Sequence, residues 1–455
     1  MSPNSSPRDL AQAELLSVLQ ESGCVLCADE SAGQSRFYFW YLNENYNNEA
    51  TIRRTRAALG FCPVHLARLV EQADPTAFAS IYAQVTAAAL AKVERAQIGL
   101  AGGDQPEKLA TVLGAEAGCP ACERQERSRK WWVATLAEGL EDTEVRRAFD
   151  DGHPVCLQHL LDCEADMGQA VSTFVARVQD LLSQPGVVGA ELLQALRGLE
   201  LSPAPGSVGK APWAPSVVGD GKPSWSGALA RLRTALQLGT CPACVFAARD
   251  RHAYLEWLTV AVVSSPYSDW APALELCRDH SWEILHVAGV ERVDPLLEAM
   301  RQQSLARLRL ARQRTGAGDV RRRKLGWSRS RQTSSTYGDH KRECPACEAG
   351  QDAAKRTCEL LLRAIPDPLL ASAYQASGGL CVPHLRLALA AAGGAESAQF
   401  LLRAARVRLA VLSWELEEVG RRRAWDRRWE PEADLSGAWR RAAEHVGGLY
   451  QRPIA

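Results

Sequence analysis

The chain has 455 residues, of which 46% are hydrophobic and 23% charged, and its formal net charge at pH 7 is +0. This composition is ordinary for a globular protein, and the length suits several domains better than one core. A neutral chain has no overall field that would attract nucleic acid or an anionic membrane, and no apolar run is long enough to span a bilayer.

Four times along the chain, a Cys-x-x-Cys pair is followed by a Cys-x-x-His pair. From the second to the third cysteine the gap is 35, 34, 33 and 34 positions. The four sets, in chain order, are Cys24, Cys27, Cys62 and His65; Cys119, Cys122, Cys156 and His159; Cys241, Cys244, Cys277 and His280; and Cys344, Cys347, Cys381 and His384. Four sets at nearly constant spacing indicate an internal repeat.

Each set supplies three thiolates and one imidazole, which is the ligand count of a closed tetrahedral zinc site. We therefore expect four structural Zn²⁺ ions, one held by each set. Zinc is favoured over an iron–sulfur cluster, because clusters mostly use cysteine alone as the protein ligand. A cluster stays the alternative, since clusters with both cysteine and histidine ligands occur. Redox chemistry of a thioredoxin-like dithiol is less favoured, because no strand alternation surrounds the pairs.

Helical patterns surround every set. A helical stretch follows each Cys-x-x-Cys, a polar or proline-containing break comes next, and a further helix begins at each histidine. The stretches after the first pairs are 37–42, 131–136, 254–260 and 358–362, and those that begin at the histidines are 65–73, 159–167, 280–288 and 384–392. The sequence thus predicts an all-helical chain, and longer amphipathic helices are expected at 77–96 and 398–419.

A helix of about 16 residues carries the chain roughly 25 Å away from its first cysteine pair. If both pairs of a set share one metal, the chain must return. We therefore predict an all-α protein of four repeated helical-hairpin modules, each closed by its own Cys₃His site of the treble-clef or zinc-ribbon kind.

The expected domains follow from these sets and from two polar linkers. They are metal-binding modules at 1–100, 105–200, 228–312 and 343–430, a Pro/Gly/Ser-rich linker at 201–227, a basic linker at 313–342 and a C-terminal tail at 431–455. The linker at 201–227 divides the chain into halves with two modules each.

The cysteines also indicate a compartment. Twelve of the fourteen belong to the four sets, and each set ends in a histidine, which a disulfide does not need. The first ten residues lack the apolar core of a signal peptide. We expect metal-bound thiolates in a reducing cytoplasm.

Three other features favour packing over chemistry. Cys163 follows His159 by one helical turn, so it could approach the second metal, but a small buried side chain is the favoured role. Cys358 matches core positions of the other modules. The aromatic cluster at 37–46 could stack on a ligand, but core packing is favoured because equivalent positions elsewhere are also apolar.

The sequence contains none of the common enzyme motifs, and a set of four protein ligands leaves no open metal position for catalysis. We expect a non-enzymatic scaffold or adaptor for another macromolecule, with a protein as partner. A nucleic-acid-binding regulator that uses the basic runs at 321–324 and 421–428 is an alternative. A redox or metal-responsive protein is another alternative.

One resemblance adds to this interpretation. The segment GCVLC at 23–27, the sequence Asn-Glu-Asn-Tyr at 43–46 and GFCPVH at 60–65 resemble an uncharacterised bacterial family of unknown function with paired CxxC and CxxH motifs. The likeness is strongest over the first hundred residues, and CVLC lacks the proline of the usual form. It implies metal binding at the cysteines and histidines named above, and it implies no activity.

Overall fold

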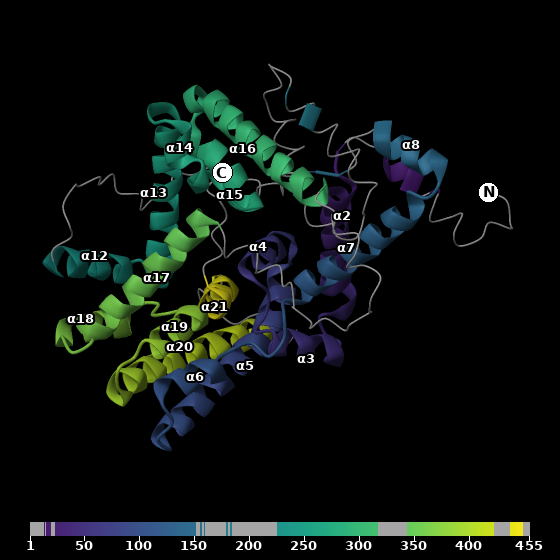
Figure 1. Ribbon diagram of the computed structural model, residues 1–455. Helices are drawn as coiled ribbons and strands as arrows, with labels where there is room; N and C mark the ends of the chain where they lie inside the picture. The colour runs from purple at the N-terminus through teal and green to yellow at the C-terminus, as the bar shows by residue number, and fades with distance from the viewer. Residues whose placement is uncertain are drawn as a thin grey trace. The chain divides into compact units, whose positions relative to one another are not determined.

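The computed structural model describes residues 13, 15–19, 23–151, 155–156, 159, 179–180, 183, 225–316, 344–422 and 437–448. Every regular element in these ranges is a helix, which confirms the predicted all-α class (Figure 1). Within the same ranges, none of the helices combines the length and apolar character needed to cross a bilayer. Most of both expected linkers, and Cys163, lie outside the described residues.

The helices of the first half begin with those of the first module. They are α2 (Val25–Trp40), the π-helical turn η1 (Tyr41–Asn45), α3 (Glu49–Ala57), α4 (Pro63–Gln72) and α5 (Pro75–Ala101). Next come α6 (Pro106–Val112), α7 (Pro120–Gly139) and α8 (Thr143–Asp151). The first module thus consists of a long helix, a short return helix, a helix that begins at the Cys-x-x-His pair and a second long helix.

The second half repeats this order. Its helices are α12 (Trp225–Gln237), α13 (Pro242–Ser264), α14 (Tyr267–Trp270), the 3₁₀ turn η2 (Pro272–Leu274), α15 (Arg278–Ala288), α16 (Val290–Gly316), α17 (Pro345–Ala364), α18 (Pro368–Ala376), α19 (Val382–Ala390), α20 (Ala395–Arg422) and α21 (Ala438–Gly447). The last of these helices lies in the stretch that the sequence analysis assigned to a C-terminal tail. The repeat of long and short helices is therefore visible in the described parts of both halves.

The cysteine pairs determine where helices begin. In the three CPAC segments the proline is the first helical residue, where its missing N–H costs no hydrogen bond, so the cysteine before it occupies the N-cap position. Cys62, Cys277 and Cys381 are N-cap residues with extended backbone. Because the second member of each pair follows three residues later, both members face the same side of the first turn.

The chain divides into two compact units, each built from three separate stretches. The first comprises 1–35, 124–203 and 254–345. Its core joins apolar side chains of α2, α7 and α8, including Leu26, Leu136 and Phe149, and Leu305 of α16 contributes to it. Three cysteines belong to the same buried cluster: Cys24, Cys27 and Cys156.

The second unit comprises 36–123, 204–253 and 346–455. Its most extensive contact is between α5 and α20, which lie side by side, and α6 packs against α19 (Figure 1). Small buried residues such as Ala89 of α5 and Ala405 of α20 let the two long helices approach closely. Helix α21 packs on α5, α20, α19 and α4, with its Trp439 ring 4.9 Å from that of Phe78.

Candidate metal centres

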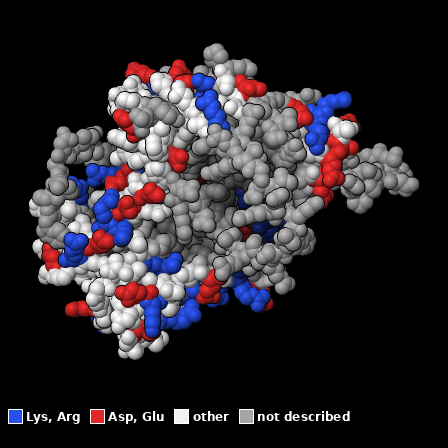
Figure 2. Space-filling model, viewed as in Figure 1, with Lys and Arg blue, Asp and Glu red and all other residues white. Residues whose placement is uncertain are grey.

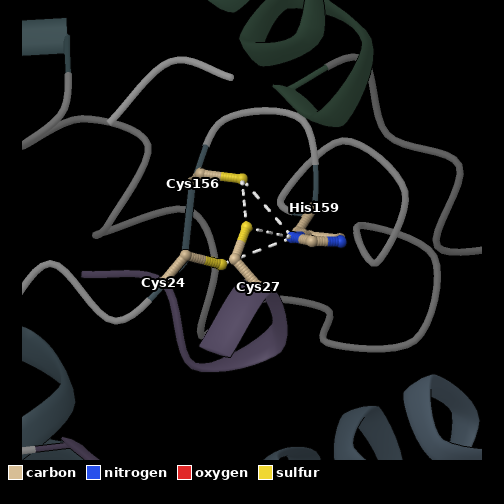
Figure 3. Close-up of side chains that lie close together, drawn as sticks. All are labelled: Cys24, Cys27, Cys156 and His159. Atoms are coloured by element: carbon tan, nitrogen blue, oxygen red, sulfur yellow. Dashed lines mark hydrogen bonds between the residues drawn. The ribbon is translucent and has the colours of Figure 1, made fainter. Parts of the chain in front are cut away.

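The structure gathers the sixteen predicted ligands into four Cys₃His clusters. We call them site 1 (Cys24, Cys27, Cys156 and His159), site 2 (Cys62, His65, Cys119 and Cys122), site 3 (Cys241, Cys244, Cys381 and His384) and site 4 (Cys277, His280, Cys344 and Cys347). In each cluster the four ligand atoms lie within 4.8 Å of one another. Figure 3 shows the three sulfur atoms of site 1 turned toward the His159 ring.

The expected grouping of the ligands was wrong. Each Cys-x-x-Cys pair shares its cluster with the Cys-x-x-His pair of the neighbouring module, so modules one and two exchange pairs, as do modules three and four. Every site therefore joins two modules, and no described module closes a site with its own two pairs.

Helix lengths explain the error. The 16 residues of α2 carry the chain about 24 Å from the first cysteine pair, whereas the 9 residues of α3 return it by only about 14 Å. The Cys-x-x-His pair therefore arrives beside the far half of α2. Consistent with this, the Tyr38 hydroxyl, eleven residues after Cys27, donates to the His65 carbonyl at 3.0 Å.

Module four repeats this contact at the equivalent position. Cys358 also lies eleven residues after the second cysteine of its pair, Cys347, and its thiol donates to the His384 carbonyl at 3.6 Å. Cys358 is fully buried, as the packing interpretation predicted. In modules one and four, the later part of the first helix thus supports the module's own histidine, about 16 Å along the helix from the second cysteine of the pair.

The crossing of α2 and α7 provides the exchanged partner. The Gln34 amide donates to the Gln125 side-chain carbonyl at 3.2 Å, and the Ser128 hydroxyl donates to Asp29 at 2.6 Å. Later residues of one helix thus meet earlier residues of the other, so the two helices run antiparallel through this region. The Cys119 and Cys122 pair at the start of α7 consequently lies beside the far half of α2, where His65 is supported.

The distances in site 1 fit a single tetrahedral ion. The Cys27 and Cys156 sulfurs are 3.8 Å apart, and the three sulfurs lie 3.3 to 3.4 Å from His159 Nδ1. A tetrahedron with metal–sulfur bonds of 2.3 Å has an edge of about 3.8 Å. A disulfide would need about 2.05 Å, and every described cysteine is free.

The other sites have similar dimensions. In site 2, the Cys62 and Cys122 sulfurs are 3.6 Å apart, and the three sulfurs lie 3.1 to 3.7 Å from His65 Nδ1. In site 3, the Cys244 and Cys381 sulfurs are 3.7 Å apart. In site 4, two sulfurs lie 3.1 and 3.3 Å from His280 Nδ1. The same tetrahedral geometry therefore recurs along the chain.

All four histidines face their clusters through Nδ1, which leaves Nε2 directed elsewhere. In site 1, Nε2 of His159 lies 3.1 Å from the buried Glu30 carboxylate, and in site 4, Nε2 of His280 lies 3.7 Å from the buried Glu283. A carboxylate there fixes the proton on Nε2 and keeps Nδ1 free for a metal. The sequence analysis missed both glutamates, although each follows a ligand by three residues on the same helix face.

The electrostatics of site 2 favour negative charge on one sulfur, that of Cys62, and raise the pKa of the neighbouring Cys122 thiol. Burial would lower the pKa of His65, but hydrogen bonds to Cys119 and Cys62 outweigh it and raise this pKa to about 10. Hydrogen bonds from Cys119 and Cys122 hold the pKa of Cys62 well below its usual range. The cluster therefore stabilises a Cys62 thiolate beside the His65 imidazolium. A divalent cation would replace the proton as the positive charge.

The aromatic cluster at 37–46 divides between core and surface. Phe37, Tyr38 and Tyr41 are buried, and the Tyr41 ring meets Phe61 edge to face with centroids 5.2 Å apart. Phe39 and Trp40 are exposed. Core packing thus accounts for the inward half of the cluster and positions the residue before Cys62.

Comparison with known families supports the predicted resemblance. Residues 15–181 match the model of a family of unknown function, DUF6062, and this segment contains all eight ligands of sites 1 and 2. The match therefore extends beyond the first module and covers a complete exchanging pair of modules. Searches of curated proteins and of solved structures each returned no match.

The exchanged grouping predicts how paired substitutions change metal content. C27A and C156A remove ligands from the same site, so the double variant should retain three ions of four after incubation with a weak chelator. C27A and C62A lie in different sites, so this double variant should retain two. Native mass spectrometry measures the metal content, and E44A, which changes an exposed glutamate, is the control that should retain four. The reverse order for the two double variants would show that each module closes its own site.

Glu30 provides a second prediction. E30A should weaken metal binding at site 1 by about 10- to 100-fold, because His159 loses the acceptor that orients it, and E30Q should have a smaller effect. Chelator titration followed by alkylation and peptide mass spectrometry at Cys24 measures this site alone. The control E44A changes an exposed glutamate. Equal protection of Cys24 in E30A and the control would contradict the role given to Glu30.

Proposed function

We propose that this protein is a non-enzymatic helical scaffold in which four Zn²⁺ ions each fasten two neighbouring modules together. The observation that supports this most strongly is the exchange of ligand pairs: each cluster draws two ligands from each of two modules. A metal in such a site crosslinks segments distant in sequence, so its binding energy contributes directly to folding.

The donor sets favour zinc as the resident metal. Three thiolates and an imidazole at the spacing of one tetrahedron suit a single ion. In iron–sulfur clusters the protein ligands are distributed over two or more iron atoms, which sets them farther apart than the edge of one tetrahedron. An iron–sulfur protein remains the alternative that metal analysis decides.

The same donor sets support a structural role for the metal. A catalytic zinc keeps one position for water or substrate, whereas each of these sets offers four protein ligands. We accordingly propose no enzymatic activity for the four centres.

A protein partner is the second part of the proposal. On α20, Val407, Val411 and Trp414 are 63%, 49% and 59% exposed, and their spacing places them on one face of the helix. An apolar stripe of this kind is suited to contact the apolar surface of another protein. We further propose that the protein works in the reducing cytoplasm of a bacterium, in agreement with its free cysteines and the family resemblance.

The nucleic-acid alternative receives less support. Of the basic stretch at 421–428, the described residues Arg421 and Arg422 both pair with Glu418 at 2.6 Å, which neutralises part of their charge. The basic run at 321–324 lies outside the described residues. On the face shown in Figure 2, basic and acidic side chains of the described residues are interspersed.

The zinc proposal predicts four zinc ions per chain in protein purified without oxygen, and a colourless solution. Complete removal by a strong chelator should abolish the cooperative thermal transition, because structural zinc contributes about 10 kcal/mol or more to folding in small domains. Elemental analysis and circular dichroism measure the two quantities. Iron with sulfide and a brown colour would contradict the proposal, as would an unchanged transition after all metal is removed.

The adaptor proposal predicts that α20 contacts a specific protein. Crosslinking in the native cell with identification by mass spectrometry should place a partner peptide against α20, and V411E/W414E should remove it. The control Q399E introduces a negative charge at another exposed position of the helix. All three proteins should carry the same zinc content. A wild-type chain without a crosslinked partner at α20, or a partner that V411E/W414E retains, would count against the proposal.

A further inference from the structure

The four centres fall into two classes by exposure. In site 1, all four ligands are between 0% and 5% exposed, and in site 3 all three cysteines are buried. In site 2, all three cysteines are partly exposed, and in site 4 two of them are, Cys277 and Cys347. The same rule holds in both halves of the chain: the centre with the earlier Cys-x-x-Cys pair has only buried cysteines and is called closed, and its counterpart has partly exposed cysteines and is called open.

Apolar packing accounts for the closed class. The cysteines of site 1 belong to the hydrophobic cluster of the first unit, and those of site 3 belong to the cluster of the second unit. Site 3 is also covered by the end of α21. A methyl group on Gly448, whose φ is +85°, would lie 3.7 Å from the Cys381 sulfur and 3.9 Å from that of Cys244. Solvent molecules therefore reach these sulfurs only when the surrounding core opens.

The open class combines access with nearby sulfurs. Cys62 and Cys122 are both partly exposed, and their sulfurs are 3.6 Å apart. Reactive thiols are those that are ionised and accessible, and metal ligation keeps sulfur ionised. A small oxidant can therefore reach site 2 while the core of the unit stays closed.

We propose that sites 2 and 4 are oxidant-sensitive centres that release their metal reversibly, while sites 1 and 3 hold the fold. This inference rests on the proposed function, because it requires the four metal sites. The oxidant is hydrogen peroxide. A Cys62 or Cys122 thiolate attacks the peroxide, the O–O bond breaks, and a sulfenic acid and hydroxide form. The second thiolate then displaces hydroxide from the sulfenic acid and forms a disulfide.

Together the two steps consume two thiolates and one hydrogen peroxide, and they form one disulfide and two hydroxide ions. The two sulfur atoms are oxidised, and the peroxide oxygen atoms are reduced. Loss of two ligands frees the Zn²⁺ of site 2. A dithiol reductant restores both thiolates by exchange, and the site can bind metal again. In site 4, the partly exposed pair Cys277 and Cys347 provides the corresponding two thiolates.

The test uses the full chain loaded with four zinc ions and treated with limiting hydrogen peroxide. Zinc release is followed with a chromogenic chelator, thiol protection by alkylation and peptide mass spectrometry, and helicity by circular dichroism. We expect about half of the zinc to leave at least about tenfold faster than the rest, with a Cys62–Cys122 disulfide and with most helicity retained. Added dithiothreitol and zinc should restore four ions.

Two variants assign the fast phase. In C62A, the part of the fast zinc release that comes from site 2 should be absent. In C27A, which removes a ligand of the closed site 1, the whole fast zinc release should remain. The labelling pattern of the wild-type chain decides the question without variants. Release of all four ions at one rate, first oxidation of Cys27 or Cys244, or no release while thiols at site 2 remain reduced would overturn the proposal. A chain that binds no zinc from the start would instead overturn the proposed function itself.

Discussion

Each candidate centre joins the first turns of two helices that belong to different modules, and most of the architecture depends on this constraint. The thiolates lie at helix N-termini, where the helix dipole and free N–H groups stabilise negative charge. Two such ends must meet for one ion to be bound. The antiparallel crossing of α2 and α7 lets α2 deliver Cys24 and Cys27 at one end and support the histidine of its own module, His65, at the other.

The exchange also explains why the modules occur in pairs. One module by itself supplies two ligand pairs that belong to different sites, so neither site is complete. Two neighbouring modules together complete two sites. The family match at 15–181 coincides with one such pair, and modules three and four repeat the arrangement. A pair of modules with two shared Cys₃His clusters is therefore the unit that the sequence repeats, and closed and open centres alternate within it. In our proposal, the closed centre holds the fold and the open centre reacts with oxidants.

Much of this could be predicted from the sequence. The residue types and spacing identified all sixteen residues of the four Cys₃His clusters, and helical periodicity predicted the all-α class. The grouping could not be predicted, because spacing fixes how many ligands a set contains and leaves open which sets share an ion. Only the lengths of α2 and α3 show that the chain returns too short a distance for Cys27 to meet Cys62. Glu30 and Gly448 were missed for a related reason, since their roles depend on contacts with distant segments.

The central claim is that neighbouring modules exchange ligand pairs around single metal ions. The most direct measurement is the crystal structure of the metal-loaded chain with anomalous diffraction at the zinc edge. Our account predicts four separate zinc peaks, each bonded to the Cys-x-x-Cys pair of one module and the Cys-x-x-His pair of its neighbour. Peaks bonded to both pairs of a single module, or an iron–sulfur cluster in place of single ions, would contradict it.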